Sequence, residues 1–167
     1  MTIAARSLTR ARRKSRGSWE EILARLVPID RQRLEEVAFD IIDPSGERRK
    51  DVSSAALEAT EIWTLIGGWK GIEALENNCA VLIDLAFYVQ QSFPEALRVS
   101  EELRLHAREI EWQISRLKVA QTTGKLESTI PTYAQQAVAT YYLMTRRVLE
   151  LYGQGNLSML EELQRAL

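Results

Sequence analysis

The chain has 167 residues, of which 46% are hydrophobic and 27% charged, and its formal net charge is −1. These values are typical of a globular domain and exclude collagen-like, mucin-like and fully disordered proteins. A single cysteine, Cys79, excludes an intrachain disulfide framework, and a single histidine, His106, excludes every motif that requires two.

The first 17 residues form a basic segment that precedes an acidic body. The six basic side chains of this segment are Arg6, Arg10, Arg12, Arg13, Lys14 and Arg16, and no acidic side chain accompanies them. The rest of the chain holds 16 basic and 23 acidic residues, a balance of −7. We expect a flexible arm at 1–17 and one helical domain at 18–167. The asymmetry indicates an anionic partner for the arm, either nucleic acid or an acidic protein, with a solvated tail as the alternative.

Two short helices are predicted after the arm. Ser18 and Glu21 have the spacing of a capping box, so a helix is expected to begin at Trp19 and to end before Pro28. Asp30 is the predicted N-cap of a second helix, whose apolar residues recur at helical spacing as far as residue 42.

Four further helices follow from apolar residues at helical spacing and from the turn residues between them. They are predicted at about 53–66, 70–91, 95–122 and 132–152. Gly67 and Gly68 separate the first two, and a short last helix is expected after Asn156 or Ser158 as its cap.

The predicted fold class is all-α. We expect an antiparallel bundle of about six or seven helices, with three long ones and the shorter N-terminal helices packed on them. The short connection near 92–94 favours an antiparallel hairpin. The longest apolar run, residues 79–89, is too short to cross a membrane, and Asp84 interrupts it. We therefore expect a cytoplasmic protein with a reduced and buried thiol and no membrane contact.

A polar layer interrupts the seam of this hairpin. Equal rise in the two helices places Asn78 beside Glu109, within about a turn of His106 and Gln113. We expect these polar groups to bond one another or water, because buried polar groups need partners. The layer either fixes the helix register or binds a small ligand. Glu102 shares the face of His106, but one imidazole is a weak metal signal, so no metal and no cofactor are expected.

Tryptophan residues near the same hairpin provide a second candidate ligand site. The same estimate of register brings Trp69 close to Trp112, and Trp63 precedes the glycine pair. These indoles either line a pocket for a flat apolar ligand or fill the end of the core or a dimer interface.

Three functions remain open, because neither a nucleophile elbow nor a phosphate-binding loop is present. The first is a non-enzymatic helical interaction or regulatory protein. It would be homodimeric through the heptad seam of residues 96–117, with the basic arm on nucleic acid or another anionic partner. The second is a ligand-binding or enzymatic bundle that uses the polar layer around His106. The third is a regulatory subunit whose acidic body binds a basic protein.

Overall fold

The computed structural model describes residues 17–49 and 56–167. Within these ranges the chain is helical, apart from its connections and one isolated antiparallel bridge between Ile42 and Arg48. The predicted all-α bundle is confirmed. The six basic residues predicted for the arm lie outside the described residues.

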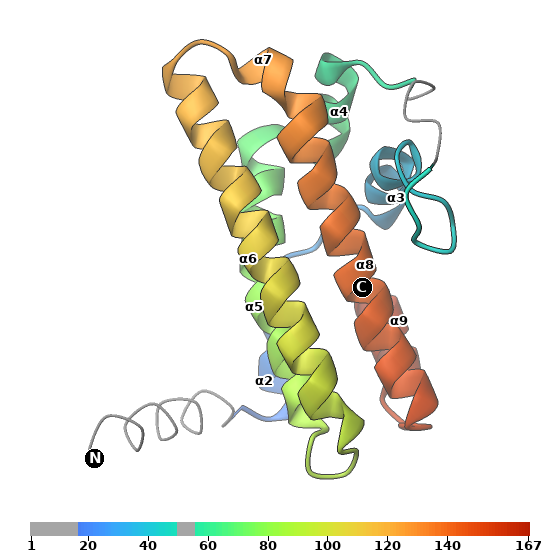
Figure 1. The fold of residues 1–167 in the computed structure, drawn as a ribbon. Helices are drawn as coiled ribbons and strands as arrows, with labels where there is room; N and C mark the ends of the chain where they lie inside the picture. Colours follow the sequence, from blue (N-terminus) through green and yellow to red (C-terminus); the bar gives the residue numbers. More distant parts are fainter. Residues whose placement is uncertain (1–16, 50–55) are drawn as a thin grey trace, which may run out of the picture.

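Three long helices form the body of the molecule and run antiparallel to their chain neighbours (Figure 1). They are α5 (Gly68–Tyr88), α6 (Glu95–Thr122) and α8 (Gln135–Gln154). The chain passes from α6 to α8 through α7 (Leu126–Thr129) and the π-helical segment η2 (Ile130–Ala134). The predicted hairpin between the first two long helices is therefore present.

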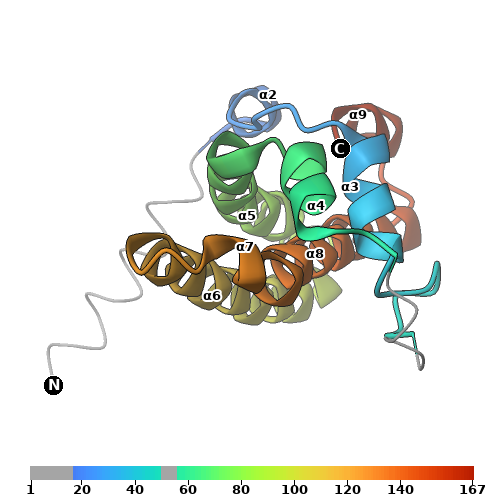
Figure 2. The ribbon, with the colours of Figure 1, turned by 90° about the horizontal axis from the view of Figure 1, so that it is seen from above.

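Four short helices complete the fold: α2 (Trp19–Ala24), α3 (Arg31–Phe39), α4 (Ala59–Ile66) and α9 (Leu160–Ala166). Seen from above, α2, α3 and α9 lie along one side of the molecule, and α6 and α7 lie along the opposite side (Figure 2). Helices α4 and α5 lie between them. No described helix covers the outer side of α6. None of the helices in the described ranges is both long enough and apolar enough to cross a membrane.

Local hydrogen bonds explain where the first helices begin. The Ser18 hydroxyl accepts from the Glu21 amide at 3.2 Å, while the Glu21 carboxylate accepts from the Ser18 amide at 2.9 Å. The Asp30 carboxylate accepts from the Arg33 amide at 3.2 Å. Both predicted caps are confirmed, because each satisfies an amide that has no acceptor within its own helix.

Other helix boundaries differ from the prediction. Helix α8 begins at Gln135, because residues 130–134 form a π-helical turn. The N-cap of α9 is Met159, so neither Asn156 nor Ser158 caps this helix. Asn156 instead adopts a positive φ of 48° in the turn before it, a conformation that asparagine tolerates better than most residues.

The core lies between α5, α6 and α8. The apolar residues of the heptad seam in α6 are fully buried in it: Ala96, Val99, Leu103, Ile110 and Leu117. The seam predicted to pair with a second chain is thus occupied by the chain's own α5 and α8. Self-association would need a different surface.

The two ends of the described chain meet in space. The Trp19 indole donates to the Glu162 carboxylate at 2.7 Å and packs against the ring of Tyr152, with centroids 5.6 Å apart. Arg25 pairs with Asp84 at 2.7 Å and holds α2 against α5. Helix α2 is therefore fixed by contacts far away in the sequence.

Candidate functional site

Asn78 joins α5 to the segment between α2 and α3. Its side chain is 2% exposed and forms two hydrogen bonds of 2.8 Å with the main chain of Val27, accepting from the amide and donating to the carbonyl. It also donates to the Tyr141 hydroxyl at 3.2 Å and accepts from Asn77 at 3.2 Å. Burial raises the pKa of Tyr141, so this hydroxyl stays protonated. The amide is fully used by these bonds, which gives it a structural role.

His106 and Gln113 belong to a different cluster, on α6. Glu109 lies between them in the sequence and accepts from Gln113 at 3.4 Å and from the Thr140 hydroxyl of α8 at 3.5 Å. Among the described residues, Nδ1 of His106 and Oε1 of Gln113 are buried without a hydrogen-bond partner. Asn78 bonds to neither of them. The three residues of the predicted polar layer therefore share no hydrogen bond with one another.

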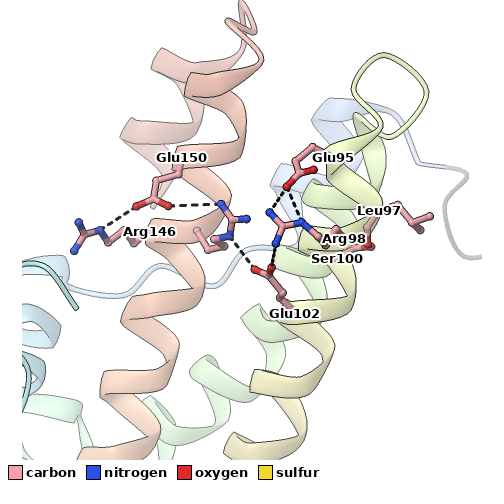
Figure 3. A network of polar contacts seen from close by, with 8 residues as sticks. Glu95, Leu97, Arg98, Ser100, Glu102, Arg146 and Glu150 are labelled. Atoms are coloured by element: carbon pink, nitrogen blue, oxygen red, sulfur yellow. Dashed lines mark hydrogen bonds and ion pairs between the residues drawn. The ribbon is translucent and has the colours of Figure 1, made fainter. Parts of the chain in front are cut away.

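The acidic residues near His106 are occupied by other partners. Glu102 accepts from Arg98 and from Arg147 of α8, each at 2.9 Å. Arg147 and Arg146 both approach Glu150, at 3.7 and 3.2 Å, so an ion-pair network links α6 to α8 (Figure 3). Within the part of the chain that the structure describes, no group of three or more His, Cys, Asp or Glu residues is placed to hold a metal ion.

The candidate tryptophans take part in different aromatic contacts. Trp69 packs edge-on against Trp63 at the α4–α5 corner, with ring centroids 5.3 Å apart. Trp112 packs edge-on against Tyr133 of η2 at 5.6 Å. The Arg116 guanidinium lies 5.2 Å from the centroid of the Trp112 ring, a distance at which a cation is attracted to an indole.

Cys79 is buried, as predicted. Its sulfur lies 3.9 Å from that of Met144 in the core. Burial, helped by the nearby carboxylates of Glu111 and Glu76, raises the pKa of the thiol to about 12. The thiol is consequently protonated at neutral pH and is a poor nucleophile.

The outer side of α6 carries an exposed apolar stripe that the sequence analysis missed. Leu105, Trp112 and Val119 are 65%, 52% and 57% exposed, and each is seven residues from the next. We define these three residues as the α6 stripe. The repeat was visible in the sequence, but the more apolar seam on the opposite side of the same helix has the same period.

Charged residues flank the α6 stripe. Arg108 and Arg116 are exposed, and neither takes part in an ion pair with another described residue. Glu109, on the same outer part of α6, is exposed as well. An apolar line with charged residues at its edges is the arrangement that helix–helix interfaces use for packing and for orientation.

Comparison of the chain with protein-family models, with curated proteins and with solved structures gives no match. Its function must therefore be inferred from the residues themselves.

Proposed function

We propose that this chain is a non-enzymatic helical interaction protein that pairs with a second copy through the outer side of α6. In this proposal the basic residues of 1–17 bind an anionic partner. The exposed α6 stripe is the observation that carries the proposal. Large apolar side chains recur at heptad spacing on the outer side of α6, and a second helix packed there would bury them.

The α6 stripe is symmetric about its central residue. Leu105 precedes Trp112 by seven residues, and Val119 follows it by seven. A two-fold axis at Trp112 would pair the indoles and place Leu105 opposite the partner's Val119 in an antiparallel arrangement. Helix α6 has 28 residues and is about 42 Å long, so both outer contacts fit within its length.

The charges beside the stripe match the same arrangement. Helical periodicity places Glu109 and Arg116 on one flank of the stripe, with Arg108 and Ser115 on the other. Pairing centred on Trp112 brings Glu109 close to the partner's Arg116, and the symmetric contact repeats this pair. Arg108 would lie near the partner's Ser115. Each copy thus contributes one attractive pair, and no like charges oppose one another beside the stripe.

Sedimentation of the full chain between 1 and about 100 μM tests the pairing. We expect a dimer. Trp112→Ser should raise its dissociation constant by about 30-fold, because an aromatic side chain at the centre of an interface contributes strongly to binding. Leu97→Ser is the matched control, since Leu97 is also exposed on α6 but lies off the stripe. A monomeric wild type at 100 μM, or equal effects of the two variants, would contradict the proposal.

A charge exchange tests the predicted orientation. Glu109→Arg and Arg116→Glu should each weaken the dimer, because each brings like charges together, and the double variant should restore it. Failure of the double variant to recover would exclude the antiparallel register while leaving a dimer of another geometry.

A small-ligand bundle is the second candidate function. The unpartnered Nδ1 of His106 and Oε1 of Gln113 favour it, because buried polar atoms of this kind are normally satisfied by a bound group or by water. Water, which both donates and accepts hydrogen bonds, can satisfy both atoms, so this candidate is second to the first.

A further inference from the structure

A hollow of about 220 Å³ opens between the α2–α3 link, the α4–α5 corner and α8. Its buried lining residues are Leu34, Ala74, Leu75 and Val138, and less buried apolar side chains surround them. These surrounding residues are Val27, Ile29, Leu65 and Ile66. Val27 is 39% exposed, which is high for a valine beside a core. The structure therefore leaves apolar surface uncovered inside a concave site, as ligand pockets do.

Positive charge dominates the polar part of the same hollow. Arg33 and Lys70 both line it, together with one acidic residue, Asp30. The Asp30 carboxylate already caps α3 and lies 3.5 Å from the Arg33 side chain. Lys70 is exposed and takes part in no ion pair with another described residue. Helix α5 begins beside it at Gly68 without a side-chain cap, which adds to the positive potential.

We propose that this hollow binds a short aliphatic carboxylate. The hydrocarbon chain lies on Leu34, Leu75 and Val138, and the carboxylate is held by Lys70 and Arg33. A cavity of about 150 Å³ accommodates benzene, so the larger hollow has room for an aliphatic chain of about six to eight carbons. Both halves of such a ligand match: the tail replaces water on apolar surface, and the head meets an unpaired cation.

The inference is independent of the pairing proposed above. The α2–α3 link lies along the side of the molecule opposite to α6 (Figure 2). No residue of the α6 stripe lines the hollow. A ligand could therefore bind here whether or not two copies pair.

Calorimetric titration of the full chain with octanoate tests the site. We expect a dissociation constant below about 1 mM for a ligand of this size. Acetate lacks the tail, and octylammonium reverses the charge of the head, so each should bind at least about tenfold more weakly. Equal binding of octanoate and octylammonium would overturn the assignment of the cations, and no octanoate binding would overturn the site.

Two pairs of variants separate the tail from the head. Ala74 lines the hollow, so Ala74→Leu should fill it and abolish binding, whereas Ala80→Leu on the exposed side of α5 should not. Lys70→Gln should weaken binding about tenfold, and Lys118→Gln, an exposed lysine of α6, should leave it unchanged. The Lys70 pair remains decisive if Ala74→Leu fails to fold. Octanoate binding that is unchanged in Lys70→Gln or in a folded Ala74→Leu would refute the proposal.

Discussion

The side chain of Asn78 forms the hydrogen bonds that the main chain of Val27 would otherwise lack. Its two 2.8 Å bonds to Val27 satisfy an amide and a carbonyl in a segment that has no helix of its own. The sequence predicted a buried, hydrogen-bonded Asn78, but with His106, Gln113 or water as its partners. It did not predict Val27 as the partner, because the two residues are 51 apart and their contact depends on how the α2–α3 link crosses α5.

Replacement of this amide should therefore be costly. Asn78→Leu would leave the Val27 amide and carbonyl without partners, and we expect the free energy of unfolding to fall by about 2 to 4 kcal/mol. Glu73→Leu, at an exposed position of the same helix, should cost less than about 1 kcal/mol. Urea denaturation of both variants measures the difference. Equal losses would show that the buried pairing with Val27 contributes little.

The α4–α5 corner brings the main chains of two successive helices into close contact. Gly67 and Gly68 adopt φ values of +88° and +62°, which permit the sharp reversal. A Cβ atom on Gly71 would lie 1.8 Å from the carbonyl oxygen of Ile66. The sequence predicted the break at the glycine pair. It gave no signal that Gly71 is a point of backbone contact, since a glycine inside a helix has the same local pattern whether or not it is crowded.

Gly71→Ala should therefore destabilise the protein despite the better helix propensity of alanine. The obstacle is a main-chain atom that no side-chain rotation can move, so we expect a loss of more than about 2 kcal/mol. Gly153→Ala in α8 is the matched control. Nothing lies within 4 Å of its added methyl group, and it should stabilise the protein by about 0.5 to 1 kcal/mol. Thermal unfolding of the two variants should shift in opposite directions, and a parallel shift would contradict the crowding.

Helix α6 shows why an element can be predicted while its role is not. Its bounds, residues 95–122, agree with the sequence pattern, because Pro94 and Gly124 frame a long run of good helix formers. The helix carries two apolar lines of the same period, one through Leu103 and one through Trp112. Only the packed structure shows that the first lies in the core and the second in solvent.

At the scale of the whole molecule, charge is the feature that the sequence defines best. The surplus of basic residues in 1–17 stands against an acidic remainder. The layered arrangement in Figure 2 could not be predicted, because it depends on contacts such as Arg25 with Asp84, which join residues far apart in the chain. Amphipathic patterns define which side of a helix is buried but not which helix covers it.

The basic segment should bind a polyanion in a salt-dependent manner. We expect the full chain to bind a fluorescent oligonucleotide and the affinity to fall steeply as salt rises, because bound cations release counterions. The triple variant Arg12→Ala, Arg13→Ala, Lys14→Ala should bind about tenfold or more weakly at low salt. The control is Lys118→Ala, Lys125→Ala, Arg165→Ala, which removes the same charge from exposed positions away from the segment and from the α6 stripe. Fluorescence anisotropy distinguishes them, and equal binding by both variants and the wild type would assign no such role to the segment.

The bond between Trp19 and Glu162 also bears on how the protein is made. Their positions are 143 residues apart, so at about 5 to 20 residues per second Trp19 is synthesised roughly 7 to 29 s before Glu162. During that interval α2 has neither α9 nor the ring of Tyr152 to pack against. On the nascent polypeptide, α2 can therefore dock on α5 through Arg25 and Asp84, while the bond that closes the Trp19 indole is made only with the last described helix.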